Sequence, residues 1–217
     1  MREDVIKKTL EKKIVVIVRG VFGEDCVRLA QALYEGGIEL MEVTFDQSKP
    51  EAFSNTTDTL RLLVNKLGDK MVFGAGTVTS VEMVYMAKEA GAQFIVSPDT
   101  NEQVIRATVE AGMVSMPGAM TPTEIVTAYS YGADFIKVFP IGNLGASYLK
   151  AVKAPLNHIK MLAVGGVNEK NIGEYMAAGA VGAGVGGQLV NKEWIANGEF
   201  DKITALAKKF VESVSGW

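Results

Sequence analysis

The stretch Glu89-Ala-Gly-Ala-Gln-Phe-Ile-Val-Ser-Pro98 contains the unit from which this chain is built. It begins with the end of an amphipathic helix, continues through a glycine, and ends in a short apolar run typical of a buried strand. Similar helix ends occur at 35–38, 110–113 and 177–180, each with a glycine that a strand-like run soon follows. Glycine at this position predicts a left-handed residue that ends the helix. We therefore expect helices and strands to alternate along the chain.

The apolar runs begin roughly 20 to 32 residues apart, which is the repeat of one strand, one helix and two loops. No linker or low-complexity segment interrupts them. The pattern predicts an α/β fold, a (β/α)8 TIM barrel with an extra N-terminal helix, formed by residues 1–217 as one domain. An open doubly wound sheet is the rival, but no GxGxxG follows the first strand. The expected strands are 13–19, 39–45, 71–76, 94–98, 114–118, 135–139, 161–165 and about 183–186; the expected helices are 24–34, 81–90, 101–111, 122–129, 146–152 and 169–178, with terminal helices at about 3–10 and 201–214 that cap the two ends.

The composition excludes several classes of function. The chain is 48% hydrophobic and 22% charged with a net charge of −3, so it is typical of folded globular proteins and carries no broad basic surface for nucleic acid. No signal-like segment or membrane-spanning apolar run is present, which predicts a cytoplasmic protein without membrane contact. Cys26 and His158 are each alone, which argues against a disulfide framework, a Cys- or His-rich metal site and a Ser-His-Asp triad. We expect neither a metal nor a cofactor.

Lys137 is the first candidate for chemistry, because it interrupts an otherwise apolar strand. Alternation places Phe135, Lys137 and Phe139 on one face of that strand and Ile136 and Val138 on the other. If the aliphatic pair faces the helices, Lys137 points into the barrel. Burial there lowers the pKa of an amine and frees it to attack a carbonyl group. The structural alternative is a lysine that snorkels to solvent or pairs with a carboxylate.

Glu42 is the second candidate, on the same face of the second strand as Leu40 and Thr44. An inward carboxylate near the end of this strand could pair with Lys137 or move protons. The alternative is a purely structural ion pair. Glu39, at the start of the same strand, is expected at the opposite end of the barrel in a structural role.

Two glycine pairs follow the last two expected strands: Gly165-Gly166 after the seventh and Gly186-Gly187 after the eighth. Barrel enzymes often bind phosphate in these two loops, through backbone N–H groups that glycine allows to approach closely. The pairs therefore predict a phosphate site, with tight turns as the alternative reading.

Further candidates end other strands at the same rim. Arg19 follows the first strand and suits a substrate carboxylate, since its forked guanidinium matches that group. Thr77 follows Gly74-Ala-Gly76 and adds a hydroxyl and N–H donors. Pro98 and Phe139 could wall a small apolar pocket. An exposed arginine, a tight turn and ordinary core packing are the respective alternatives.

With these residues located, the chain resembles the class I 2-keto-3-deoxy-6-phosphogluconate (KDPG) and 4-hydroxy-2-oxoglutarate (KHG) aldolases. The resemblance runs from about residue 13 to residue 190 and implies a homotrimeric (β/α)8 enzyme that uses no metal. It is carried by seven short motifs in one order: Glu42-Val-Thr, Gly74-Ala-Gly-Thr-Val, Val96-Ser-Pro98, Met116-Pro-Gly118, Lys137-Val-Phe-Pro140, Val164-Gly-Gly166 and Gly186-Gly187.

The resemblance also implies roles for the candidate residues. Lys137 would form a Schiff base with the C2 ketone, and Glu42 would shuttle protons for carbinolamine formation, dehydration and cleavage of the C3–C4 bond. Thr77 and neighbouring amides would hold the pyruvate carboxylate, with Pro98 and Phe139 around the pyruvate methyl group. The two glycine pairs would hold the phosphate. The products would be pyruvate and D-glyceraldehyde 3-phosphate from KDPG, or pyruvate and glyoxylate from KHG.

Two positions depart from the family pattern. The phosphogluconate aldolases carry a carboxylate-binding arginine where this chain has Asp46, and Arg19 would substitute for it. The phosphogalactonate aldolases of the same family look similar here, with an arginine after strand one and none after strand two. A serine that helps hold phosphate in many members corresponds to Gln188, which leaves the phosphate contacts mostly to the backbone.

Several functions therefore stay open. KDPG is the first expected substrate, with its phosphogalactonate isomer and KHG as alternatives. A metal-dependent epimerase of sugar phosphates is disfavoured by the single histidine. A phospho-ligand sensor without catalysis would need the glycine loops but not a buried lysine, so Lys137 distinguishes the two classes.

Overall fold

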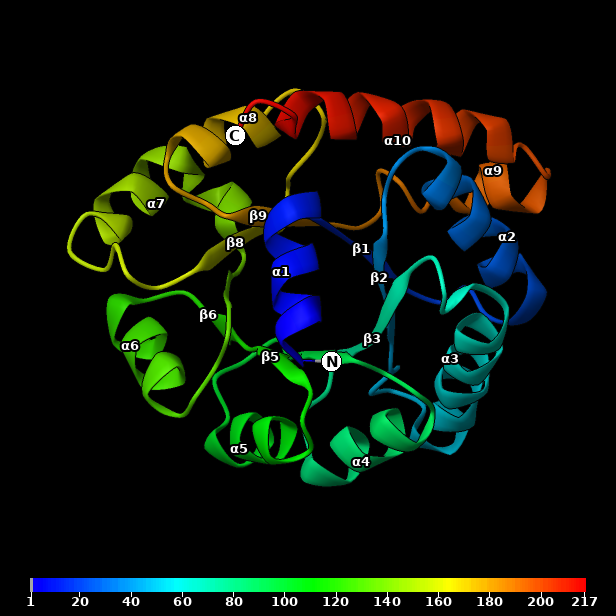
Figure 1. Ribbon diagram of the computed structural model, residues 1–217, viewed down its shortest axis with the longest axis horizontal. Coiled ribbons are helices and arrows are strands. Elements are labelled where there is room, and N and C mark those ends of the chain that lie inside the picture. The colour runs from blue at the N-terminus through cyan, green and yellow to red at the C-terminus, as the bar shows by residue number, and fades with distance from the viewer. Residues whose placement is uncertain (1) are drawn as a thin grey trace.

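The computed structural model describes residues 2–217 and shows one sheet of parallel strands with helices around it (Figure 1). The order of neighbouring strands is β5-β4-β3-β2-β1-β9-β8-β7-β6. The strands are β1 (Ile14–Val18), β2 (Leu40–Thr44), β3 (Val72–Gly76), β4 (Phe94–Val96), β5 (Val114–Met116), β6 (Gly118–Ala119), β7 (Ile136–Val138), β8 (Met161–Val164) and β9 (Gly182–Val185).

β5 and β6 are two halves of one barrel strand, interrupted at Pro117, which has no N–H to donate to a neighbouring strand. β5 pairs with β4 and β6 pairs with β7. The Lys137 N–H donates to the Pro117 carbonyl at 2.9 Å, and the Phe135 N–H donates to the Ser115 carbonyl at 3.2 Å. These contacts close the ring, so the expected barrel with an N-terminal helix is confirmed.

Alternation along the strands sorts their side chains into two apolar layers. Leu40 and Phe135 belong to the cluster inside the barrel. Met41, Ile136 and Val138 belong to the larger cluster between the sheet and the helices. Glu42 and Lys137 have the same parity as the inner set, so the expectation that both point into the barrel is correct.

The helices form a ring around the sheet. Those expected at 24–34, 81–90, 101–111, 122–129 and 146–152 are present within one residue at each end. The helix expected at 169–178 is shorter in the structure, where only α8 is helical. The helices are α1 (Arg2–Lys12), α2 (Gly23–Glu35), α3 (Phe53–Leu67), α4 (Val81–Glu89), α5 (Glu102–Glu110), α6 (Pro122–Ser130), α7 (Gly145–Lys153), α8 (Ile172–Ala177), α9 (Lys192–Ala196) and α10 (Phe200–Val214), with short 3-10 turns η1 (Pro50–Ala52) and η2 (Ile141–Asn143).

α3 and the short α9 were not expected from the sequence. α3 begins with a polar run rich in threonine, so the first half of the helix lacks the regularly spaced apolar residues that predict an amphipathic helix. Thr56, Thr57 and Thr59 are nevertheless buried, because their hydroxyls find backbone partners. The Thr56 hydroxyl donates to the Thr44 carbonyl at 3.0 Å, and the Thr59 hydroxyl accepts from the Gly23 N–H at 3.0 Å.

The glycines that were expected to end helices have left-handed backbones. Gly37, Gly91, Gly112 and Gly179 have φ values of 92°, 90°, 77° and 100°. This conformation is strained for residues with a Cβ atom, so glycine ends these helices and turns the chain into the next strand. The repeated sequence signal is thus a backbone requirement.

The two terminal helices do different things. α1 lies across one end of the barrel (Figure 1), where Lys8 and Lys12 bind the two carboxylate oxygens of Glu39 at 2.8 Å and 2.6 Å. The expected structural role of Glu39 is therefore correct. α10 does not cap the other end: it packs on the outside against α2 and α8. The end of the barrel opposite α1 is left free for a site.

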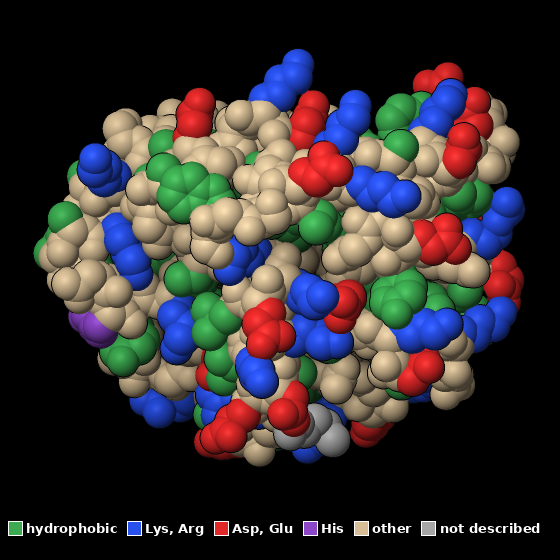
Figure 2. Space-filling model, turned by 45° about the horizontal axis from the view of Figure 1, so that its top comes forward, with side chains coloured by type: hydrophobic (Ala, Val, Ile, Leu, Met, Phe, Trp, Pro, Cys, Tyr) green, Lys and Arg blue, Asp and Glu red, His purple; other side chains and the backbone are tan. Residues whose placement is uncertain are grey.

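Among residues 2–217, no helix is both long and apolar enough to cross a bilayer. Figure 2 shows basic and acidic side chains interspersed on the face that it presents. This mixture agrees with the small net charge of −3.

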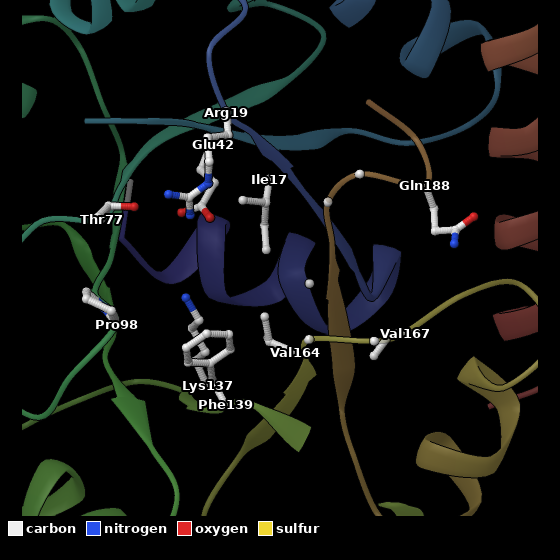
Figure 3. Close-up of a pocket in the computed structure, with 15 residues that line it drawn as sticks. Ile17, Arg19, Glu42, Thr77, Pro98, Lys137, Phe139, Val164, Val167 and Gln188 are labelled. Carbon is white, nitrogen blue, oxygen red and sulfur yellow. The ribbon is translucent and has the colours of Figure 1, made fainter. Parts of the chain in front are cut away.

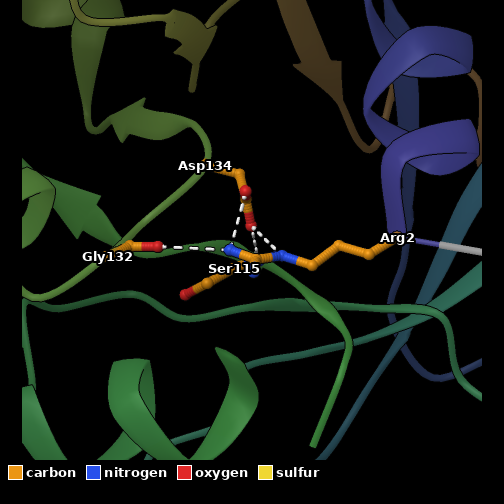
Figure 4. Close-up of polar contacts among 4 residues, drawn as sticks. All are labelled: Arg2, Ser115, Gly132 and Asp134. Atoms are coloured by element: carbon orange, nitrogen blue, oxygen red, sulfur yellow. Dashed lines mark hydrogen bonds and ion pairs between the residues drawn. The ribbon is translucent and has the colours of Figure 1, made fainter. Parts of the chain in front are cut away.

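Asp134 fastens α1 to the barrel at the fifth strand (Figure 4). Its carboxylate accepts from Arg2 Nη2 at 2.9 Å, from Arg2 Nε at 3.3 Å and from the Ser115 N–H at 2.9 Å. The Asp134 side chain is only 9% exposed, whereas that of Arg2 is 32% exposed. Asp134 therefore satisfies a buried backbone donor as well as an ion pair.

Replacing Asp134 should destabilise the fold more than replacing Arg2. Asp134→Ala leaves the Ser115 N–H without its acceptor and should cost about 2–3 kcal/mol in unfolding free energy. Arg2→Ala removes only a partly exposed ion pair and should cost about 0.5–1 kcal/mol. Denaturant unfolding of both variants measures the difference. Equal losses would show that the ion pair, not the Ser115 contact, supplies the stability.

Candidate active site

A cavity of about 540 Å³ opens at the carboxyl ends of the strands, opposite α1. All ten residues expected from the sequence as site residues line it, and they come from loops and strand ends throughout the chain. The roles assigned to them stay predictions. They are Arg19, Glu42, Thr77, Pro98, Lys137, Phe139, Gly165, Gly166, Gly186 and Gly187.

Lys137 lies on β7, and its amine points toward the Glu42 and Arg19 side chains (Figure 3). The residue is 9% exposed, and its Nζ lies 4.8 Å from the centre of the Phe139 ring. Burial lowers the pKa of Lys137, an effect that the Glu42 carboxylate partly opposes and Arg19 reinforces. A lowered pKa increases the fraction of neutral amine, which is the nucleophilic form.

Glu42 lies on β2 and is 1% exposed. Burial raises its pKa to about 7, against the opposing effects of Lys137 and Arg19. Its Oε2 atom is buried without a hydrogen-bond partner within the described chain. Such an atom is costly unless something in the site uses it. A carboxyl group with a pKa near neutrality can both give and take a proton at physiological pH.

The glycines of β3 make room for the interior side chains. A Cβ atom on Gly76 would lie 2.4 Å from Glu42 Oε2, and one on Gly74 would lie 2.5 Å from the Phe94 ring. Gly76 therefore leaves space for the Glu42 carboxylate. The N–H donors expected in this stretch stay a prediction, and the close contacts at the two Cβ positions add a steric reason for both glycines.

Arg19 and Thr77 reach the cavity from the loops after β1 and β3. Figure 3 shows the Arg19 guanidinium and the Glu42 carboxylate together on one side, with Lys137 and Phe139 facing them and the Thr77 hydroxyl directed toward the group. Thr77 has a φ of 57°, which is rare for a β-branched residue. Strain of this kind tends to occur at functional sites.

The two glycine pairs differ in backbone conformation. Gly165 and Gly166 have φ values of 94° and 76°, which residues with side chains rarely adopt. Gly186 and Gly187 are not in the left-handed region, and a Cβ atom on Gly187 would meet nothing within 4 Å. The first pair is thus required by the turn, whereas the second leaves open space beside the cavity.

Other lining residues were missed by the sequence analysis. Ile17 has the inward parity of β1, so alternation could have found it, and Gln188 was noted there only as a departure. Beyond Arg19 and the second glycine pair, a smaller cavity of about 250 Å³ continues to Lys192. No local pattern marks Lys192, since it is the first residue of the short helix α9, which was not expected. The remaining lining residues are Val164, Val167 and Gly184 in the main cavity and Val190 in the smaller one.

Three residues lie outside this chemistry. Asp46 is not among the lining residues: its Oδ1 accepts from the Ser48 N–H at 3.0 Å and the Ser48 hydroxyl at 2.7 Å, which lowers its pKa. Cys26 is fully buried in α2, and burial raises its thiol pKa to about 12. Cys26 is thus part of the helix core. His158 is exposed in the segment before β8.

Known proteins resemble this chain over nearly its whole length. The sequence model described as "KDPG and KHG aldolase" matches residues 5–206. The 2-dehydro-3-deoxy-6-phosphogalactonate aldolase of Escherichia coli K12 is 33% identical, covering 93% of this chain and 96% of its own. The 2-dehydro-3-deoxy-phosphogluconate aldolase of Treponema pallidum is 34% identical, with coverage of 96% and 97%.

Solved structures agree with the sequence relatives. A structure described as native KDPGal has a TM-score of 0.84 and 32% identity, covering 94% of both chains. The KDPG aldolase of Legionella pneumophila, with pyruvate captured as a covalent carbinolamine, has a TM-score of 0.83 and 28% identity, covering 94% of this chain and 96% of its own. This chain therefore belongs to the KDPG and KHG aldolase family of lyases.

Proposed function

We propose that the protein is a Schiff-base aldolase that reversibly cleaves a 2-keto-3-deoxy-6-phospho sugar acid to pyruvate and D-glyceraldehyde 3-phosphate. The observation that carries the proposal is the buried Lys137 amine beside the buried Glu42 carboxylate in one cavity. The carbinolamine trapped in the Legionella relative supports the same chemistry. A non-catalytic phospho-ligand sensor would have no use for this buried pair.

The first half of the reaction attaches the substrate. The neutral Lys137 amine attacks the C2 ketone, and proton transfer from nitrogen to oxygen gives a carbinolamine. The Glu42 carboxylic acid then donates a proton to the C2 hydroxyl, which leaves as water, and a protonated imine remains. The raised pKa of Glu42 keeps this acid partly protonated near neutrality.

The second half breaks the carbon–carbon bond. The Glu42 carboxylate takes the proton from the C4 hydroxyl, the C3–C4 electron pair moves into the imine to form an enamine, and the aldehyde leaves. Glu42 then returns the proton to C3, and water hydrolyses the pyruvate imine to release pyruvate and the lysine amine. The imine accepts the electrons, so this scheme needs no metal.

The rest of the cavity would bind the two ends of the substrate. Arg19 and Thr77 suit the carboxylate, and Phe139 and Pro98 suit the pyruvate methyl group. The open space at Gly187 and the positive charge of Lys192 in the adjoining cavity suit the phosphoryl end. One substrate can span these positions because the two cavities share Arg19 and the second glycine pair.

Borohydride reduction in the presence of pyruvate and EDTA should trap a carboxyethyl adduct on Lys137, located by digestion and mass spectrometry. Lys137→Met should abolish both the adduct and turnover while the fold persists, because methionine fills the same space without an amine. Lys160→Met, at an exposed lysine, is the matched control and should trap normally. A folded wild-type protein that gives no adduct would rule out the imine and favour a sensor.

Glu42→Gln should lower kcat by at least about 100-fold, since the proton shuttle is lost. Steady-state kinetics with the keto acid measure this loss, and an unchanged kcat would contradict the shuttle.

The same Glu42→Gln variant should change the pH dependence of stability. The pKa of Glu42 is about 7 in the folded state and 4.5, its ordinary value, in the unfolded state, so the folded protein binds this proton more tightly. The contribution of Glu42 to wild-type stability therefore falls as the pH rises from 4.5 to about 7. Glu42→Gln should lack that decline, and thermal unfolding from pH 4 to pH 8 measures it. Parallel curves for the two proteins would contradict a raised pKa.

The substrate class is tested with the two C4 epimers, 2-keto-3-deoxy-6-phosphogluconate and -galactonate, and with KHG. Pyruvate release should be fastest for a phosphorylated epimer. The gluconate form is the first candidate. The galactonate form is the second candidate, and two observations support it: Asp46 lies outside the cavity, and Arg19 supplies the arginine at the rim. Comparison of kcat/KM between the epimers assigns the configuration. Preference for KHG over both would contradict the phospho sugar acid.

A further inference from the structure

Thr77 occupies a backbone conformation that its own residue type opposes. Its φ of 57° lies in the left-handed region, where a branched Cβ is strained. Lys13, at the junction of α1 and β1, is the other non-glycine residue with a positive φ between residues 2 and 217. A glycine would adopt this conformation without strain, so something other than backbone preference must hold a threonine there.

The contacts around Thr77 show what holds it. On one side, the Phe45 N–H donates to the Gly76 carbonyl at 2.9 Å, and on the other the Val78 N–H donates to the Val96 carbonyl at 3.2 Å. The Thr77 carbonyl itself accepts from Gln47 Nε2 at 2.7 Å. This last contact is the shortest of the three, and it is the one made by a side chain.

Gln47 uses both ends of its amide. While Nε2 donates to Thr77, Oε1 accepts from the Thr79 hydroxyl at 3.1 Å. The amide thus bridges the residues on either side of Val78 and resists rotation of the peptide between them. An amide can donate at one end and accept at the other at the same time.

Gln47 lies in the loop that follows β2, the strand that carries Glu42. The loop is folded back on itself by Asp46, whose carboxylate accepts from the Ser48 N–H and hydroxyl at 3.0 Å and 2.7 Å. Gln47 is not among the residues that line the cavity, whereas Thr77 is. Gln47 therefore contacts the lining of the cavity through Thr77.

We propose that Gln47 is a positioning residue that holds Thr77 in its left-handed conformation and so directs the Thr77 hydroxyl toward the bound keto-acid carboxylate. This role rests on the proposed aldolase function, because the carboxylate belongs to its substrate. The clamp joins the loop after β2 to the loop after β3. A loop clip that only stabilises the fold is the competing role.

The test measures pyruvate affinity separately from chemistry. In the borohydride assay, Gln47→Ala should raise the half-saturating pyruvate concentration about fivefold, as expected when one hydrogen bond that positions a ligand contact is lost. The adduct formed at saturating pyruvate should not change, because Lys137 and Glu42 are untouched. Gln47→Glu keeps the size and the acceptor but, when ionised, cannot donate to the Thr77 carbonyl, so it should show at least the same rise.

Ser48→Ala is the matched control, since it removes a side-chain hydrogen bond from the same loop without touching Thr77. Its half-saturating pyruvate concentration should equal that of the wild type. In a Thr77→Gly background the strain and the hydroxyl are both absent, so adding Gln47→Ala should have no further effect. This cycle separates positioning through Thr77 from any direct effect of Gln47.

The outcomes are distinct. Unchanged half-saturation in both Gln47 variants, an equal rise in Ser48→Ala, or a rise that persists in the Thr77→Gly background would each overturn the positioning role. If Gln47→Ala does not fold, Gln47→Glu decides alone, because it preserves the size of the side chain. A wild-type protein that traps no pyruvate would instead contradict the proposed function itself.

Discussion

The site depends on the burial of two ionisable groups of opposite charge, Glu42 and Lys137, near the carboxyl ends of the barrel strands. Glu42 is 1% and Lys137 is 9% exposed, and each loses most of its hydration. Burial moves both pKa values toward neutrality, upward for the carboxyl group and downward for the amine. Each charge limits the shift of the other. Burial therefore increases the fraction of protonated Glu42 carboxyl group and of neutral Lys137 amine.

The neighbouring backbone is adapted to this pair. Gly76 leaves room for the Glu42 carboxylate, since a Cβ atom there would overlap Oε2. The closure of the barrel at Pro117 directs the Lys137 N–H to the Pro117 carbonyl and fixes β7 in register. α1 closes the opposite end and binds Glu39 and Asp134 away from the cavity. Structural charges and site charges are thus kept at opposite ends of one barrel.

Part of the fold was hidden from sequence reasoning for identifiable reasons. α3 buries threonines whose hydroxyls are satisfied by backbone groups of β2 and α2, and such partners cannot be read from a polar run. α10 was expected to cap an end, but it packs against α2 and α8, because an amphipathic helix takes whichever face is uncovered. Lys192, the first residue of the unexpected helix α9, lines only the smaller adjoining cavity, which a local sequence pattern could not show.

The sequence by itself determined the alternation of helices and strands, the parity of each strand and hence the inward direction of Glu42 and Lys137. These follow from local rules: period-two alternation and the need for glycine in left-handed turns. Only the tertiary structure decided how deeply the pair is buried, why Gly76 is small, and that a side chain from another loop holds Thr77 at a φ of 57°. Those properties arise between segments distant in sequence, where space and solvent exposure depend on the closed barrel.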